Sequence, residues 1–151
     1  MRVLLVTLLL AGTSARGARL VAQAPTPAAT DSARLQGTWS MVSGAADGYP
    51  MPAAYVQSMR RVASGSEVTV EMGGRLFFKA TISLEPTRSP KTIDYHMTGG
   101  PTVGTVQLGV YEISGDTARF CFASPGKARP KEFATNAGDG RTLSTWVRTA
   151  P

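Results

Sequence analysis

The sequence predicts an all-β protein, an up-and-down antiparallel barrel of about eight strands. Apolar and polar residues alternate with a period of two through most of the chain beyond residue 59, which is typical of half-buried strands. Paired glycines and Gly-Asp pairs separate these segments, and such tight turns join antiparallel neighbours. No helical pattern is long enough for a parallel crossover, and closing the sheet removes its exposed edges.

The expected elements follow one another with short connections. The expected strands are 38–43, 60–63, 67–72, 75–85, 92–98, 105–114, 117–123 and 142–148. One short helix, 52–59, follows the first strand and has a proline in its first turn, where no N–H is needed. In the fourth strand, Leu76, Phe78 and Ile82 share the predicted inward face. In the sixth strand the apolar face switches near Gly109, as a β-bulge would cause.

The first 24 residues are predicted to be a secretory signal peptide and leader, cleaved after residue 15 or residue 24. Arg2 precedes an apolar run at 3–11 that is too short to span a bilayer. Residues 25–34 have nothing apolar to bury and are expected to form a disordered linker before the barrel domain at 35–148. We therefore expect an exported protein, periplasmic or extracellular, with no stable membrane span after leader cleavage.

Composition argues against several classes of function. Of 16 basic residues, Arg2, Arg16 and Arg19 lie in the leader, which leaves 13 against 10 acidic residues. These 13 are scattered, whereas nucleic-acid binding usually shows a basic stripe with interleaved aromatic residues, so no nucleic-acid partner is expected. Cys121 is the single cysteine and lies between two phenylalanines. It forms no internal disulfide and is expected to act as a small buried apolar side chain.

A series of short motifs carries a resemblance to a known family. The motifs are Leu35-Gln36-Gly37-Thr38-Trp39, Pro90-Lys91-Thr92-Ile93-Asp94, Gly109-Val110-Tyr111-Glu112, Gly115-Asp116-Thr117, Cys121-Phe122-Ala123 and Arg129-Pro130. In this order they resemble an uncharacterised lipocalin-like family of exported bacterial proteins. The resemblance implies a lipocalin-like barrel and no established activity, substrate or catalytic residue. By similarity to lipocalins proper, Trp39 after Gly37 is expected to pack against Arg148 of the closing strand.

The search for catalytic chemistry is mostly negative, so the protein is not expected to be an enzyme. No nucleophile elbow, zinc-binding helix or phosphate-binding loop is present, and no cofactor or metal site is expected. Asp94 and the sole histidine, His96, stand at i and i+2 and share a strand face, as a base and its orienting partner would. That face lies opposite Ile93, Tyr95 and Met97, which are predicted to point inward, so the pair is expected to face solvent.

Two functions remain from the sequence alone. The first is non-catalytic binding of a small lipophilic molecule inside the barrel. Its candidate lining residues are Phe78, Ile82, Tyr95, Met97, Tyr111 and Phe120. The alternative is an interaction or structural protein of the cell envelope, with a filled core, that acts through loops such as 124–140. The presence or absence of an internal cavity separates these two hypotheses.

Overall fold

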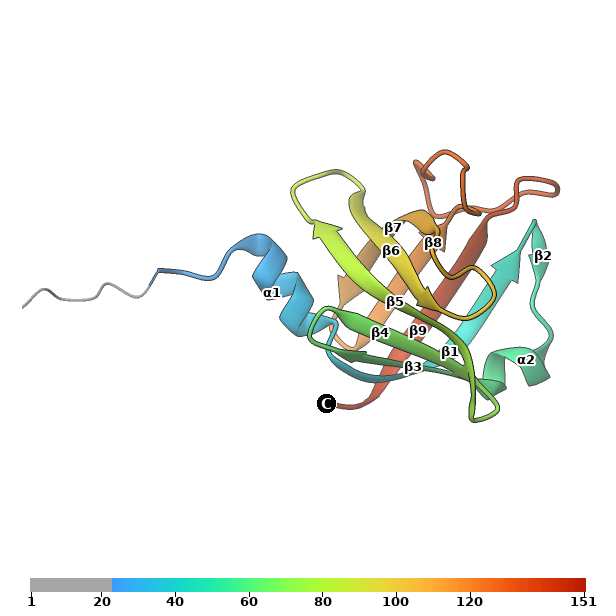
Figure 1. Ribbon diagram of the computed structural model, residues 1–151, viewed down its shortest axis with the longest axis horizontal. Coiled ribbons are helices and arrows are strands. Elements are labelled where there is room, and N and C mark those ends of the chain that lie inside the picture. Colours follow the sequence, from blue (N-terminus) through green and yellow to red (C-terminus); the bar gives the residue numbers. More distant parts are fainter. Residues whose placement is uncertain (1–22) are drawn as a thin grey trace, which may run out of the picture.

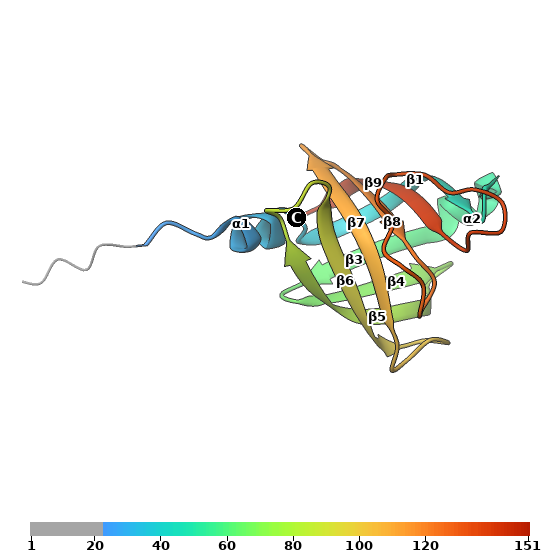
Figure 2. The same ribbon diagram turned by 90° about the horizontal axis from the view of Figure 1, so that it is seen from above.

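The computed structural model describes residues 23–151, so the predicted signal peptide, up to residue 22, lies outside the described residues. Helices α1 and α2 lie at opposite ends of a barrel (Figures 1 and 2). In chain order the elements are α1 (Pro27–Arg34), β1 (Gly37–Ala46), β2 (Tyr49–Pro50), α2 (Ala53–Ser58), β3 (Met59–Ser64), β4 (Glu67–Met72), β5 (Arg75–Glu85), β6 (Lys91–Gly99), β7 (Val106–Ser114), β8 (Thr117–Phe122) and β9 (Thr142–Ala150).

The sheet closes on itself through β1. From β3 to β9 each strand pairs antiparallel with the next, and β1 pairs with β3 on one edge and with β9 on the other. The very short β2 adds only to the end of β1. The predicted fold class is therefore confirmed as a closed, lipocalin-like barrel of eight antiparallel strands with one short helix early in the barrel.

One side of β1 is only partly paired. Its first residues, 37–40, pair with β3, and its last two, 45–46, pair with β2, so no strand partners the stretch between them on this edge. The N–H of Met51 donates to the carbonyl of Gly44 at 2.9 Å in this gap. A Cβ at Gly44 would lie 2.5 Å from the sulfur of Met51. The chain from β2 to α2 thus takes the place of a strand at this end.

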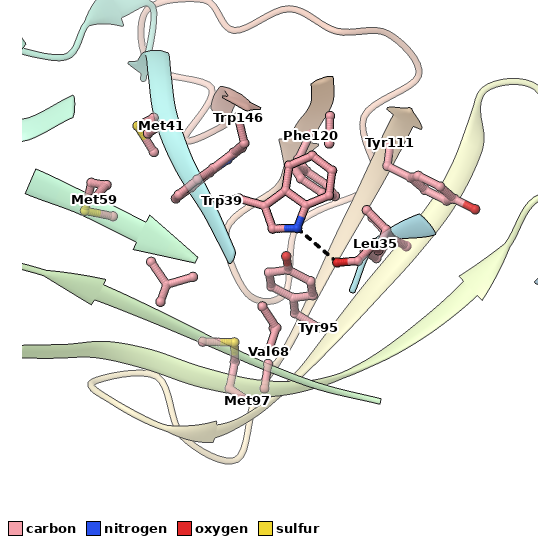
Figure 3. Packing of buried hydrophobic residues seen from close by; sticks show 14 of the residues in the cluster. Leu35, Trp39, Met41, Met59, Val68, Tyr95, Met97, Tyr111, Phe120 and Trp146 are labelled. Carbon is pink, nitrogen blue, oxygen red and sulfur yellow. Dashed lines mark hydrogen bonds between the residues drawn. The ribbon is translucent and has the colours of Figure 1, made fainter. Parts of the chain in front are cut away.

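Trp39 seals the other end of the barrel (Figure 3). Its ring is fully buried, and its Nε1–H donates to the carbonyl of Leu35 at 3.1 Å. The guanidinium carbon of Arg148 lies 4.3 Å from the centroid of the Trp39 ring, which is the cation–π contact that the resemblance implied. Arg148 also donates to the carbonyls of Arg34 and Gln36, so one arginine of β9 ties the start of β1 to the segment before it.

The expectation of a disordered linker at 25–34 is wrong for most of that segment. Thr26 caps α1 by accepting from the N–H of Ala29 at 3.2 Å. Asp31 points into the barrel end and is 3% exposed. It accepts from Lys91 Nζ at 2.6 Å and from the Tyr111 hydroxyl at 2.8 Å. The Asp31 carboxylate, together with the contacts of Arg148 and Trp39 at the end of α1, therefore docks a helix that has little apolar surface to bury.

Two local expectations about strand faces are also corrected. In β5, Leu76 is 56% exposed, whereas Phe77 packs against the core, because the register between β4 and β5 shifts beside Phe77. In β7 the register is continuous, so there is no bulge at Gly109. Val110 is instead buried on the outer surface of the barrel, in a depression that it shares with Pro130. The loop at 123–141 (the β8–β9 loop) covers this outer surface.

Replacing Trp39 by alanine tests the seal. Truncation of a buried aromatic residue costs about 3–5 kcal/mol, a large part of the ~5–15 kcal/mol that stabilises an ordinary domain. We expect Trp39→Ala to lower the free energy of unfolding by this amount in urea denaturation. Val42→Ala is the matched control, because Val42 is in the same strand and is 53% exposed. Equal stability of the two variants would mean that burial of Trp39 does not stabilise this end of the barrel.

Replacing Asp31 by asparagine tests the docking of α1. Burial raises the pKa of Asp31, but its hydrogen bonds with Lys91 and Tyr111 and the charges of Lys91 and Arg34 outweigh burial, so the pKa lies below 3.8. A carboxylate with a lowered folded pKa adds stability above its unfolded pKa and loses it as the pH falls through the folded value. We expect Asp31→Asn to cost about 1–3 kcal/mol at neutral pH.

The pH dependence of that cost separates the carboxylate from a general packing defect. The stability difference between wild type and Asp31→Asn should shrink as the pH falls below 3.8, measured by urea denaturation across the acid range. Glu67→Gln is the control, because Glu67 forms a half-exposed pair with Lys79, and such pairs contribute about 0–1 kcal/mol. A difference that stays constant with pH would mean that the Asp31 charge does not hold α1.

Candidate functional site

A cavity of about 190 Å³ lies inside the barrel, in the half nearer α2. In β1, Met41 and Ala46 line it and Trp39 does not. In β3, Met59 and Arg61 line it, and Arg61 is the register partner of Trp39. The cavity therefore extends from the α2 end of the barrel to Arg61, where the Trp39 seal begins.

The segment that replaces a strand beside β1 forms one wall of this cavity. Met51 and Tyr55 both line it. Tyr55 packs edge-on against Phe77, with 6.4 Å between ring centroids, and burial raises the pKa of its hydroxyl above 10.0. Methionine is flexible and polarizable and adapts to irregular apolar shapes, so this wall suits a variable apolar occupant.

A continuous row of aromatic rings, which begins beside Tyr55, forms another wall of the cavity. Centroid distances are 5.8 Å from Phe77 to Phe78, 5.7 Å from Phe78 to Tyr95, 4.2 Å from Tyr95 to Phe122 and 6.1 Å from Phe122 to Phe120. Tilted contacts at these distances are favourable for aromatic pairs. Because each ring is held by its neighbours, the row gives the cavity a fixed apolar surface.

Glycine at position 109 makes room for this row. A Cβ there would lie 2.5 Å from the ring of Phe122. The absence of a side chain at position 109 is therefore a packing requirement of the aromatic wall.

The polar atoms of the cavity are few and include no carboxylate. The polar side chains among its lining residues are Tyr55, Arg61, Tyr95, Gln107, Thr142 and Ser144. The Ser144 hydroxyl accepts from Trp146 Nε1 at 2.9 Å and keeps its own hydrogen for another acceptor. Arg61 donates from Nε to the Tyr95 hydroxyl and from Nη1 to the Leu35 carbonyl, both at 3.4 Å. The cavity is thus apolar, with hydrogen-bond donors at its inner end.

The structure places three of the six predicted lining residues, Phe78, Tyr95 and Phe120, on the cavity wall. The other three lie elsewhere. Met97 is buried in the core outside the cavity, and Tyr111 points to Asp31 at the α1 end. Ile82 keeps the inward phase of Phe78 and packs against the core, but it lies farther along β5, beside α1 and beyond the cavity.

Sequence reasoning missed Arg61 and the residues around α2. An arginine in a short strand is normally exposed, and in 60–63 the strand pattern alone does not separate inward Arg61 from outward Arg60. One signal was available. Met59, Arg61 and Ala63 stand two residues apart and therefore share one face of the strand, and two of the three are apolar. Met51 was missed because it stands in an irregular segment whose position depends on long-range contacts.

Asp94 and His96 lie on the outer face of β6, as the sequence analysis expected, and not in the cavity. Asp94 Oδ1 is 2.6 Å from Arg129 Nη1 of the β8–β9 loop, an ion pair by distance that lacks hydrogen-bond geometry. The Arg129 guanidinium instead donates to the carbonyl of Gly109 at 2.8 Å. His96 is exposed, and its Nε2 lies 3.3 Å from the Ser83 hydroxyl. The two residues therefore have separate partners.

Neither a metal-ligating cluster nor a membrane-spanning helix is found in the described part of the chain. Within residues 23–151, no group of three or more His, Cys, Asp or Glu side chains is placed to hold a metal ion. The helices of this part are too short and too polar to cross a membrane. Comparisons of the chain with protein-family models, curated proteins and solved structures give no match. The function is therefore argued from the geometry of the cavity.

Proposed function

We propose that this protein is an exported, non-catalytic binding protein of the lipocalin-like kind that holds a small lipophilic molecule in its barrel. The observation that carries the proposal is the aromatic cavity between α2 and Arg61. Ligand sites in proteins are typically concave and mostly apolar, with a few polar groups that fix orientation. The cavity has both features.

The walls of the cavity favour a lipophilic ligand, because an occupant would bury its apolar surface against the aromatic and methionine side chains that line it. Because the cavity measures about 190 Å³ and ligand pockets usually measure ~300–1,000 Å³, the occupant is expected to be small.

The incomplete pairing of β1 supplies a route into the cavity. The stretch of β1 beside Met51 has no strand partner on that edge, so movement of the α2 segment breaks few sheet hydrogen bonds. Helix α2 has six residues and no side-chain cap at its N-terminus. Short helices of this kind depend on tertiary contacts for their stability. A ligand can therefore enter at the α2 end without disturbing the Trp39 seal.

The alternative of a cell-envelope protein acting through its loops has less support. It required a filled barrel, whereas the barrel contains a cavity. The β8–β9 loop is nevertheless well anchored, because the Ser124 hydroxyl donates to the Gly140 carbonyl at 2.6 Å and Arg129 donates to Gly109. This anchoring is explained by its cover of the outer face of β7 and β8.

Binding of neutral lipophilic probes tests the proposal. We expect octan-1-ol, octanamide or N-phenyl-1-naphthylamine to bind and to raise the melting temperature, because a ligand at 100 times its Kd adds about 2.7 kcal/mol of stability. Phe78→Asp should abolish binding, since it places a charge in the aromatic wall. Ala46→Phe, which fills the α2 end of the cavity without a charge, should weaken it strongly. Thermal denaturation with and without probe measures both effects.

His96→Ala is the matched control, because His96 is on the outer face of the barrel. Its probe affinity should equal that of wild type. Circular dichroism of each variant verifies that loss of binding is not loss of the fold. Failure of all three probes to bind wild type, or equal binding to wild type and Ala46→Phe, would refute the proposal.

A further inference from the structure

Arg61 is a buried positive charge inside the barrel. Arg61 is 1% exposed. It projects inward from β3 between Met59 and Ala63, which are also buried. Arginine keeps its charge under all ordinary conditions. Burial of an unpaired charge costs several kcal/mol even after the protein relaxes, so a fold normally supplies an acidic partner.

Arg61 has no acidic partner in the part of the chain that the structure describes. None of the ion pairs within residues 23–151 includes Arg61. The buried charge at the α1 end, Asp31, shows the opposite situation, because Lys91 and Tyr111 both lie within 2.8 Å of it. The same barrel thus gives one buried charge an opposite charge and leaves the other with neutral partners alone.

The neutral contacts of Arg61 are also weak. Its two hydrogen bonds, to the Tyr95 hydroxyl and the Leu35 carbonyl, are 3.4 Å long, beyond the usual 2.7–3.2 Å. The guanidinium carbon lies 5.1 Å from the centroid of Phe120, a cation–π contact that adds a modest attraction. The Nη2 nitrogen has no hydrogen-bond partner among the described residues. The guanidinium is therefore held in place with donor capacity to spare.

The cavity is the side from which compensation can come. Trp39 and Leu35, which are fully buried, close the α1 side of Arg61, whereas the side toward α2 is the cavity that Arg61 itself lines. Tyr95 lines the same cavity, and its hydroxyl accepts from Arg61, so the hydroxyl's own hydrogen remains to be donated. A guanidinium N–H and a phenolic O–H together match the two oxygens of a carboxylate.

We propose that the ligand is a small lipophilic carboxylate, with its head group on Arg61 and Tyr95 and its apolar body against the aromatic wall. This inference rests on the proposed function and deepens it by naming the class of ligand. Because the cavity wall contains no Asp or Glu, nothing there repels an anion. Nη2 is covered by neighbouring atoms, so binding requires the Arg61 guanidinium to turn toward the cavity.

The test compares octanoate with octanamide, which share a chain and differ in charge. Titration calorimetry at neutral pH should show octanoate binding to wild type about 10- to 100-fold more tightly, the range expected for hydrogen bonds to a charged group. In Arg61→Met the affinity for octanoate should fall by about this factor, while octanamide binds as before. Arg60→Met is the matched control, because Arg60 points outward from the same strand and pairs with Glu71. It should retain the preference.

The outcomes separate this inference from the proposed function. Equal binding of octanoate and octanamide to wild type, or a preference that survives in Arg61→Met, overturns the inference and leaves lipophilic binding in place. Binding of neither molecule overturns the inference, and it overturns the proposed function as well when octan-1-ol and N-phenyl-1-naphthylamine also fail to bind. Should Arg61→Met fail to fold, the NMR resonance of the Arg61 Nε–H in wild type provides the test. We expect octanoate to shift this resonance strongly and octanamide to leave it nearly unchanged. Equal shifts overturn the inference.

Discussion

The burial of Trp39 at the start of β1 is the constraint on which the rest of the structure depends. β1 pairs with β3 and β9, and Trp39 fills the space where these strands meet, with Arg148 of β9 stacked against its ring. The seal has a second consequence. Arg61 is the register partner of Trp39, so closing the barrel there removes water from Arg61 on one side. The cation is then open to compensation only from the cavity.

The two ends of the barrel consequently differ in their chemistry. At the α1 end, a buried carboxylate receives hydrogen bonds from Lys91 and Tyr111, and the backbone before β1 is tied down by Arg148. At the α2 end, methionine and aromatic side chains surround an unfilled space, and the edge of β1 beside Met51 lacks a strand partner. One end is closed and electrostatically satisfied, and the other is adaptable and apolar. Because of this asymmetry, the barrel is closed at the α1 end, and a ligand is expected to enter at the α2 end.

The barrel itself was predictable because period-2 alternation and tight glycine turns are local signals. Which face of each strand points inward was harder to predict. One register shift in β5 leaves Leu76 exposed and turns Phe77 toward the core. Helix α1 was missed because its order depends on Asp31 reaching partners far along the chain, which composition does not reveal. Arg61 was missed because arginine in a strand is normally exposed, although the phase that it shares with Met59 and Ala63 is inward.

A crystal structure of the protein with octanoate tests the central claim most directly, because it locates the head group in an asymmetric barrel. The account predicts the carboxylate within hydrogen-bond distance of Arg61 and the Tyr95 hydroxyl, with the chain extending toward Met51 and Tyr55. The reverse orientation, with the carboxylate at the α2 end and the methyl end against Arg61, would contradict it. So would octanoate bound only on the outer surface of the barrel.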